Sequence, residues 1–398
     1  MIATLLHEIR QFSLPMQTLQ FDAGLVCVAC AAVGMLYMTM AGILVRRFFS
    51  RMPAQASHYP PLSLVKPLYG AEHALLRNLQ SFCEQDYPAP VQFVFGVQDP
   101  LDPAVETIAH LRALYPLLNI TLVVDPRLYG PNRKISNILN MMPFAHHDML
   151  VFADSDVGVA PQYLRRVVDE LQAPDVGLVT CLYRGLPDPG FWPRLSAKAT
   201  NYHFLPGVIV GLALGLARPC FGQTIAMRRA TLEAIGGFWR FTHHLAEDHA
   251  IGEAVRALGQ KVVVPAFTIT HACVEKSATA LVSHELRWSR TIRSIDPLGH
   301  LGSVLTHPFA FAVLGRLLCG SSWWSWAFVL GAVLSRLTVK IQLDRTLCQA
   351  PRGFWLMPAW DIAAFLIFIT SFLSQRVTWR GFHFTVRDSK LISPVVKN

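Results

Sequence analysis

The pattern of apolar and polar residues divides the chain into three regions. The first contains 23 uncharged, mostly apolar residues, Ala23–Val45. As a helix rising 1.5 Å per residue, this run is about 34 Å long, enough to cross a hydrocarbon layer of about 30 Å. Arg46, Arg47 and Arg51 follow it, which indicates a cytosolic location for the next segment and an uncleaved anchor rather than a signal peptide. We therefore predict an N-terminal transmembrane anchor within residues 1–51.

The middle region, residues 52–300, alternates short apolar runs with runs of helical spacing. Strands are expected at 62–65, 91–97, 120–124, 149–152, 176–180 and 261–264, and helices at 71–84, 103–115 and 250–258. This alternation predicts an α/β domain with a Rossmann-like, mostly parallel sheet that helices cover on both faces. In such sheets ligands bind beyond the carboxyl ends of the strands. Asp99 and Asp154 each follow a predicted strand, so both are expected to face one crevice.

The third region, residues 301–398, is apolar again. Candidate membrane segments lie at about 304–319, 323–343 and 354–374, and charged residues interrupt them: Arg316, Arg336, Lys340 and Asp361. The tail after residue 375 is basic, which indicates a cytosolic end. An even number of crossings must then follow the middle region. Either one segment lies in the membrane interface or a fourth crossing is concealed, and the sequence leaves this open.

A shorter apolar run inside the middle region has two interpretations. Leu205–Ala217 is apolar over 13 positions, which is short for a membrane span. It is either an element of the core or an interfacial helix beside an entrance for a lipid substrate. Aromatic residues just before it, Trp192, Tyr202 and Phe204, favour the interface.

Composition narrows the class of protein. Charged residues make up only 15% of the chain and hydrophobic residues 52%, which excludes a disordered chain and disfavours a wholly soluble one. The net charge of +9 suits a surface against anionic lipid headgroups. No Lys/Arg-rich block or nucleic-acid motif is present, so no nucleic-acid partner is expected. The eight cysteines are scattered and form no zinc or disulfide framework, which favours a reducing compartment.

Three acidic signals suggest chemistry. Asp154-Ser155-Asp156 follows the apolar strand at 149–152, and two carboxylates at that spacing can converge on Mg²⁺ or Mn²⁺ bound to a diphosphate. Glu247-Asp248 precedes a predicted helix. Either these acids only stabilise the helix by lying at the positive end of its dipole, or one of them is a general base that takes a proton from an acceptor hydroxyl.

Two further clusters suit a nucleotide diphosphate. His284-Glu285-Leu286-Arg287-Trp288 offers a forked phosphate donor, Arg287, beside the flat wall of Trp288; alternatively it is an amphipathic helix at the membrane surface. Asn132-Arg133-Lys134 places two cations on a turn that faces phosphates or solvent.

The order of these motifs resembles that of membrane glycosyltransferases with the signals D, D(x)D, D and (Q/R)xxRW. In the amino-acid sequence of its motifs the chain is similar to ceramide glucosyltransferases, and it is most similar to the bacterial hopanoid biosynthesis-associated glycosyltransferases. The matching segments, spread over residues 62–385, are Leu64-Val65-Lys66-Pro67-Leu68, Asp86-Tyr87-Pro88, Val97-Gln98-Asp99, Gly130-Pro131-Asn132-Arg133-Lys134, Asn137, Gly177-Leu178-Val179, Ala246-Glu247-Asp248 and Thr378-Trp379-Arg380.

The resemblance implies a GT-A fold, a UDP-sugar donor and inversion at the anomeric carbon. It implies that the nucleotide sugar is bound by Lys66, Pro67, Asp99, Lys134, Asp154, Arg287 and Trp288. Asp154 and Asp156 would hold the divalent metal, and Asp248, next to Glu247, would be the base. Gly222, Gln223 and His284 are candidates for the acceptor site. Two departures stand out: both Asp residues of D-x-D are present, and His284 replaces the Gln/Arg of the last motif.

The expected protein is therefore an inverting, UDP-sugar-dependent lipid glycosyltransferase of the bacterial inner membrane, multi-pass, with a cytosolic catalytic domain at 52–300 and membrane helices at 301–398. The donor is UDP-N-acetylglucosamine for a hopanoid polyol acceptor, such as bacteriohopanetetrol, or UDP-glucose for ceramide. The alternatives are a processive polysaccharide synthase and a non-catalytic transporter or lipid-binding protein. The oligomeric state stays open.

Overall fold

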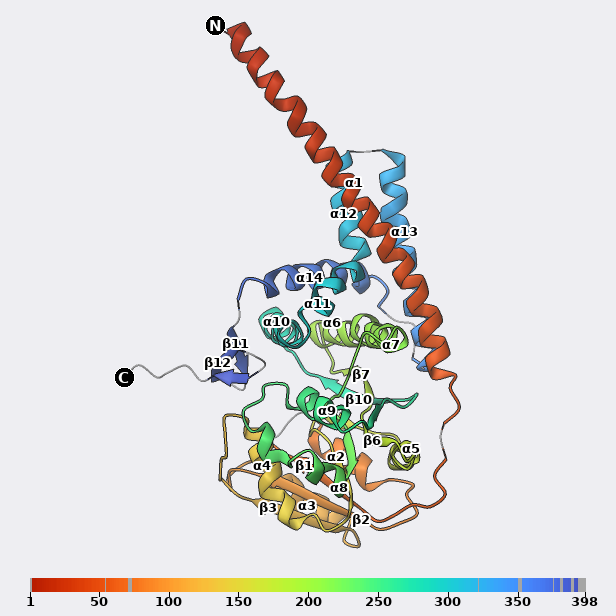
Figure 1. Ribbon diagram of the computed structural model, residues 1–398, viewed down its shortest axis with the longest axis vertical. Helices are drawn as coiled ribbons and strands as arrows, with labels where there is room; N and C mark the ends of the chain where they lie inside the picture. The colour runs from red at the N-terminus through yellow and green to blue at the C-terminus, as the bar shows by residue number, and fades with distance from the viewer. Residues whose placement is uncertain are drawn as a thin grey trace, which may run out of the picture.

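The computed structural model describes residues 2–53, 55–70, 74–320, 322–349, 353–374, 376–379, 382–387 and 390–392. An α/β body lies at one end of the molecule, and the helices α1, α12 and α13 extend away from it (Figure 1). Between the two lie α6, α7, α10, α11 and α14.

A seven-stranded sheet forms the centre of the body, in the order β3-β2-β1-β4-β8-β6-β9. Its strands are β1 Leu62–Pro67, β2 Val91–Val97, β3 Asn119–Val124, β4 Met149–Phe152, β6 Val176–Val179, β8 Ile225–Arg228 and β9 Lys261–Val263. The pairs β1/β2, β2/β3, β1/β4 and β6/β9 are parallel, whereas β8 runs antiparallel to both of its neighbours. The predicted α/β, mostly parallel sheet is thus confirmed, with β8 as the strand that the pattern did not predict.

Alternating side chains of the sheet supply two cores, as the period of a strand requires. Leu64 and Val151 face a core that also contains side chains of α2 Leu75–Cys83, α3 Ala104–Leu114 and α5 Tyr163–Leu171. Val65 and Leu150 face the other core, which α4 Arg133–Met141, α8 Arg229–Ala234 and α9 Glu247–Ala257 complete. Helices therefore cover both faces.

A second sheet lies beside the first and was not predicted. Its order is β5-β10-β7, with β5 Val157–Gly158, β10 Thr268–Cys273 and β7 Leu182–Pro187. The chain then forms α6 Phe191–Ala199, a π-helix at Thr200–Phe204 and α7 Leu205–Ala213. After β10 comes α10 Ala278–Ile295, where the Ser277 hydroxyl accepts a hydrogen bond from Ala280 N at 3.1 Å and caps the helix.

The π-helix joins the body to the helices beyond it. Asn201 accepts a hydrogen bond from Gly185 N at 2.7 Å and donates one to Gly185 O at 3.1 Å, which fixes the turn to β7. The next residue, Tyr202, accepts a hydrogen bond at its carbonyl from Arg336 at 3.1 Å, and its hydroxyl bonds to Asp344. Consecutive side chains of one turn thus contact two different parts of the molecule.

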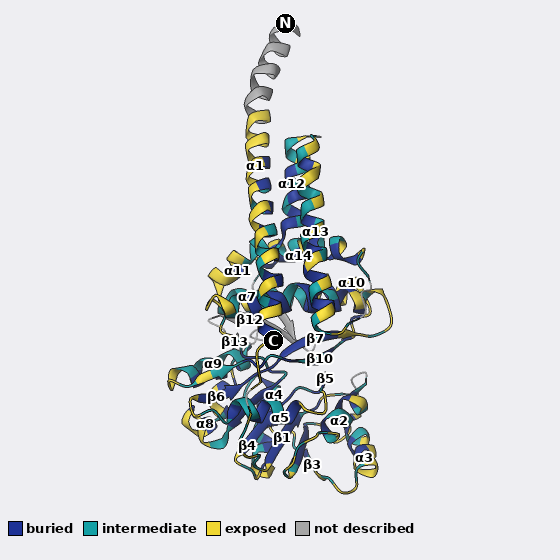
Figure 2. Ribbon diagram, turned by 90° about the vertical axis from the view of Figure 1, so that its right-hand side faces the viewer, coloured by how far each residue is buried: buried dark blue, intermediate teal, exposed yellow. Residues whose placement is uncertain are grey.

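Two of the described helices are long and apolar enough to cross a membrane: the Gln17–Phe49 part of α1 (Ile2–Phe49), and α13 (Trp323–Thr346). A third candidate is a pair of helical segments bent by 63°: Pro297–Thr306, which begins with α11 Pro297–Gly302, and α12 Pro308–Cys319. The helix α14, Leu356–Ser371, is shorter, and Figure 1 shows it lying across the direction of α12 and α13. Figure 2 shows many exposed residues along α1.

Three of the four charged residues that interrupt the predicted membrane segments, Arg336, Lys340 and Asp361, form buried ion pairs. Arg336 on α13 forms an ion pair with Asp361 on α14, and each is only 2% exposed. One turn further along α13, Lys340 and Asp344 form a second buried pair at 2.5 Å. Because an unpaired buried charge is costly, these pairs explain how apolar helices tolerate charged residues.

The chain after α14 forms a small antiparallel sheet of β11 Arg376–Trp379, β12 Phe382–Arg387 and β13 Lys390–Ile392. Arg380, the last residue of one motif used for the resemblance, lies outside the described residues.

Candidate active site

A cavity of about 810 Å³ lies between the carboxyl ends of the central strands and the helices α7 and α10. Pro67, Asp154 and Gln98 line it from β1, β4 and β2, where each of these strands ends. The walls also include Phe204, the last residue of the π-helix, and Trp288 of α10. This position matches the crevice that the strand order predicts.

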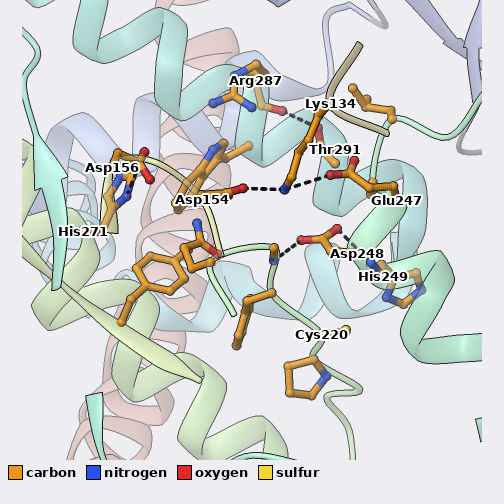
Figure 3. Close-up of a pocket in the computed structure, with 18 of the residues that line it drawn as sticks. Lys134, Asp154, Asp156, Cys220, Glu247, Asp248, His249, His271, Arg287 and Thr291 are labelled. Atoms are coloured by element: carbon orange, nitrogen blue, oxygen red, sulfur yellow. Dashed lines mark hydrogen bonds and ion pairs between the residues drawn. The ribbon is translucent and has the colours of Figure 1, made fainter. Parts of the chain in front are cut away.

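Lys134 lies at the centre of the polar end of the cavity. Its ammonium group is 2.6 Å from Asp154 Oδ1 and 3.1 Å from Glu247 Oε1 (Figure 3). The helix that carries Lys134, α4, is capped by Asn132, whose side chain accepts a hydrogen bond from Ile135 N. Asn132 also donates one to Glu247 Oε2 at 3.0 Å. Burial lowers the pKa of Lys134, but Asp154 and Glu247 outweigh this and raise it overall, so the side chain stays charged.

Asp248 occupies the first turn of α9 and faces the same cavity. Its Oδ2 accepts a hydrogen bond from Gly222 N at 3.0 Å, and its Oδ1 accepts one from His249 N at 2.8 Å (Figure 3). Burial and the neighbouring Glu247 raise the pKa of Asp248 to about 6. A carboxylate with a pKa close to neutrality is suited to accept a proton during a reaction.

Asp156 pairs with a histidine that the sequence analysis did not identify. His271 Nδ1 lies 3.3 Å from Asp156 Oδ2, because β10 pairs with β5 directly after the Asp-x-Asp motif. Burial raises the pKa of Asp156, but His271 outweighs this effect and lowers it to about 2. Only the alternating pattern of Thr268–Cys273 could have signalled that His271 points inward.

The residues around Asp156 fit a divalent cation. Asp156 Oδ1 is buried and has no hydrogen-bond partner among the described residues, and His271 is only 7% exposed. By contrast, Asp154 is bound to Lys134. The described part of the chain holds no group of three or more acidic, histidine or cysteine side chains placed for a metal. One carboxylate and one imidazole can nevertheless hold a cation whose other ligands are diphosphate oxygens.

Trp288 forms an aromatic wall between two histidines. Its ring centroid is 6.3 Å from that of His271 and 4.9 Å from that of His284. His284 Nδ1 bonds to Glu275, and although burial raises the pKa of this carboxyl, His284 lowers it to about 2. The residue that replaces the family's Gln/Arg is therefore held by a buried carboxylate.

The structure brings most of the predicted site residues together. The cavity lining includes Pro67, Lys134, Asp154, Asp156, Gly222, Gln223, Glu247, Asp248, His284, Arg287 and Trp288. Lys66 supports this wall from behind: its buried ammonium donates a hydrogen bond to Asp154 O at 2.7 Å.

Asp99 is the exception. It was expected to face the cavity, but it is exposed and does not belong to the lining, which Gln98 provides instead. The reason is local: Asp99 Oδ1 accepts a hydrogen bond from Leu101 N at 2.9 Å and closes the turn after β2. Gln98 accepts a hydrogen bond from Arg133 at 3.4 Å.

With the fold and the site described, comparison with known proteins identifies the family. The fold is of the GT-A type and is similar to that of a mannosyltransferase from Pyrobaculum calidifontis in complex with GDP-Man and Mn²⁺. The TM-score is 0.52 and the identity 19%, over 87% of this chain and 99% of that one. The family model "Glycosyl transferase family 21" matches residues 26–392, and the chain belongs to that family. The predicted resemblance at the family level is confirmed.

Curated relatives carry the same family signal. Ceramide glucosyltransferase 3 of Caenorhabditis elegans is 22% identical over 352 residues, which cover 82% of this chain and 72% of that protein. Ceramide glucosyltransferase 1 of the same organism is 23% identical over 224 residues, which cover 56% of this chain. This second match spans about half, 47%, of the relative's length.

Proposed function

We propose that the protein is a membrane-bound inverting glycosyltransferase that moves a sugar from a UDP-sugar to a hydroxyl group of a membrane lipid. The main support for this proposal is that the candidate base Asp248 and the motif residues Asp154 and Asp156 line the same cavity. Family membership supports the reaction class.

The donor binds at the polar end of the cavity. Lys134 and Arg287 supply positive charge for the diphosphate, and Trp288 supplies a flat surface beside it. Asp156 and His271 would hold a divalent cation, Mg²⁺ or Mn²⁺, which when bound neutralises charge on the leaving UDP.

Asp248 takes the proton of the acceptor hydroxyl. Its carboxylate is oriented by the backbone N–H groups of Gly222 and His249, which fix the direction in which the free lone pairs point. The hydroxyl oxygen then attacks the anomeric carbon from the face opposite UDP. A single displacement inverts the configuration and needs no glycosyl-enzyme intermediate.

The acceptor is a lipid, because the cavity also has apolar walls, and α7, which contributes to them, packs against the candidate membrane helix α1. Phe204, Val208 and Ile295 are among the apolar residues that line the cavity. The sequence motifs favour a hopanoid polyol as acceptor and UDP-N-acetylglucosamine as donor. The named relatives favour ceramide as acceptor and UDP-glucose as donor. We propose that the protein lies in the bacterial inner membrane and that its α/β body, within residues 52–300, is in the cytosol. The crossings would be α1, α13 and the bent pair within Pro297–Cys319.

A direct test uses membranes that contain the full chain or its Asp248→Asn variant. The membranes are incubated with radiolabelled UDP-N-acetylglucosamine or UDP-glucose, and the products are separated by extraction into organic solvent. We expect a labelled small lipid with the native chain and no label above background with the variant, which should still bind UDP. A labelled polymer, or equal labelling by the variant, would contradict the proposal.

A further inference from the structure

The helix α14 lies flat on α6 and α10, and contacts with these two helices hold both of its ends. At its start, the ring of Trp355 stacks on that of Phe191, the first residue of α6, with the ring centroids 6.2 Å apart. Just after its end, Arg293 of α10 donates a hydrogen bond to Ser374 O at 2.9 Å. A helix that crossed the membrane would carry one end to the far side of a hydrocarbon layer about 30 Å thick. With both ends held on the same side, α14 has the arrangement of a helix parallel to the membrane plane.

The inner side of α14 is apolar and buried. Its buried side chains form one cluster with side chains of α6 and α10: Leu356, Trp360, Ala364, Ile367, Leu195, Ala199 and Leu281. Asp361, the only charged residue of the helix, is also buried, in the ion pair with Arg336 of α13. The outer side of α14 therefore carries no charge.

This outer side is an apolar stripe that runs the full length of the helix, and we call it the α14 stripe. Its residues follow one another at intervals of three or four positions, which places them on one face: Trp355, Ala359, Ile362, Leu366, Ile369 and Leu373. Trp355 is 70% exposed, Leu366 57% and Leu373 79%. A continuous apolar patch of this length on an outer surface marks a contact with an apolar partner.

The apolar surface continues onto α11. His300 of α11 and Ser371 of α14 are both buried, and a hydrogen bond of 2.9 Å between His300 Nε2 and the Ser371 hydroxyl joins the two helices. Leu298 and Leu301 of α11 are exposed. Figure 1 shows α14 and α11 between the α/β body and the helices α12 and α13, so this apolar surface lies where the membrane helices leave the body.

The membrane helices identify the partner of the stripe. The helix α12 begins beside α14, where the ring centroids of Phe311 and Phe365 are 5.3 Å apart, and α12 and α13 extend from this level away from the α/β body (Figure 1). Because α13 is a candidate membrane span, a bilayer around it has its near surface at the level of α14. Tryptophan is enriched at such surfaces, and Trp355 lies on the stripe. A lipid bilayer suits the stripe better than a second copy of the chain, since lipid surrounds the neighbouring helices at this level.

We propose that α14 lies in the cytosolic leaflet of the bilayer, parallel to the membrane plane, with the α14 stripe against the lipid acyl chains. The inference rests on the proposed function, which places the chain in a membrane, and it adds a contact with the bilayer that the crossing helices do not provide. An interfacial helix buries its apolar face about 5–10 Å into the boundary between headgroups and acyl chains. Because α14 lies on α10, which carries Arg287 and Trp288 of the cavity wall, this contact holds the cavity at a fixed height relative to the bilayer.

Photo-crosslinking to lipid tests the partner. The full chain is placed in vesicles of phosphatidylethanolamine and phosphatidylglycerol, with p-benzoylphenylalanine in place of Leu366 on the stripe, Leu36 on α1 or Leu117 between α3 and β3. All three leucines are more than half exposed. We expect lipid adducts at Leu366 and Leu36, detected by mass spectrometry, and at least tenfold fewer at Leu117. Adducts at Leu366 as rare as those at Leu117, or a crosslink from Leu366 to a second copy of the chain, would overturn the inference. If Leu36 formed no lipid adduct either, the proposed membrane location would be wrong, so the two failures are distinguishable.

The orientation of the helix is tested by measuring the depth of its two ends. A fluorescent amino acid replaces Trp355 or Leu373, and lipids brominated at different acyl positions quench it according to its depth in the bilayer. We expect the two depths to agree within about 5 Å, as in a helix that lies in the interface. In a crossing helix the two ends would differ in depth by about 27 Å, at 1.5 Å per residue, and that result would overturn the inference.

Discussion

The ammonium group of Lys134 lies 2.6 Å from Asp154 Oδ1, so the first carboxylate of the Asp-x-Asp motif is held by a side chain of the protein itself. The second carboxylate, Asp156, is therefore the one with an oxygen left for a cation. Lys134 also bridges to Glu247, beside the candidate base. One lysine thus links the donor end of the cavity to its catalytic end.

The first prediction concerns this lysine. Lys134→Met leaves Asp154 and Glu247 without their cation, and breaking a buried ion pair typically costs about 3–5 kcal/mol of unfolding free energy. We expect a lower midpoint of thermal unfolding and at least a hundredfold loss of sugar transfer. Lys134→Arg, which keeps the charge, serves as the control and should retain more of both. A Lys134→Met variant with native stability and transfer would show that the bridge is unimportant.

The second prediction concerns pH. Because the pKa of Asp248 is raised to about 6, its carboxyl is protonated below that pH and cannot act as a base. We expect kcat/KM for transfer to rise with pH through about 6 and to level off above it. Asp248→Glu moves the carboxylate. It should either shift the pH at which kcat/KM rises or abolish transfer. A profile that is flat from pH 5 to 8 would argue against Asp248 as the base.

The third prediction concerns the metal. Imidazole is a better ligand for Mn²⁺ than for Mg²⁺, which prefers oxygen. We expect His271→Asn to weaken Mn²⁺ binding in the presence of UDP at least tenfold and Mg²⁺ binding much less, with free Mn²⁺ measured by electron paramagnetic resonance. His284→Asn, on the other side of Trp288, is the matched control and should leave Mn²⁺ binding unchanged. Equal losses for both metals would mean that His271 only orients Asp156.

The fourth prediction concerns Gly222, whose N–H bonds to Asp248. A Cβ at this position would lie 2.7 Å from Lys134 Nζ and 3.4 Å from Asp154 Oδ2. We expect Gly222→Ala to displace the lysine and to reduce transfer about ten- to hundredfold, while the unfolding midpoint changes little. Gly215→Ala would suffer from its positive φ, so Gly302→Ala, where a Cβ meets open space, is the better control. Full activity of Gly222→Ala would show that the cavity tolerates a displaced lysine.

The fifth prediction concerns the buried ion pair between α13 and α14. Asp361→Asn leaves Arg336 buried without a counter-charge, and we expect a loss of about 3–5 kcal/mol in unfolding free energy. The exchanged pair Arg336→Asp with Asp361→Arg restores opposite charges and should recover part of the loss. The measurement is thermal unfolding in detergent. A double variant no more stable than either single variant would indicate that the surrounding partners, and not the pair, are decisive.

Much of the fold could be predicted because its signals are local. Apolar runs such as Val91–Val97 are buried strands of a parallel sheet, and their length and spacing suffice to identify them. The second sheet was missed because β5 is only two residues long and β10 mixes polar with apolar residues. Its strands are set by pairing between distant segments, which no local pattern reports.

The site followed the same division. Asp154, Asp156 and Asp248 come at the ends of recognisable elements, and the family resemblance gives each a role. His271 was missed because it becomes part of the site only when β10 pairs with β5. Asp99 was misplaced because the turn after β2, which a hydrogen bond from Leu101 N to Asp99 Oδ1 helps to close, decides whether Gln98 or its neighbour lines the cavity.

The wide turn at Thr200–Phe204 constrains how this chain can change over evolutionary time. Deleting one residue between Asn201 and Phe204 would convert the turn to a regular α-helix and change the angle between the directions in which these two side chains point. Asn201 could then no longer reach Gly185 while Phe204 kept its place beside Tyr183, 4.8 Å away in ring centroids. Insertions and deletions in related chains should therefore be found on either side of this segment and be absent within it.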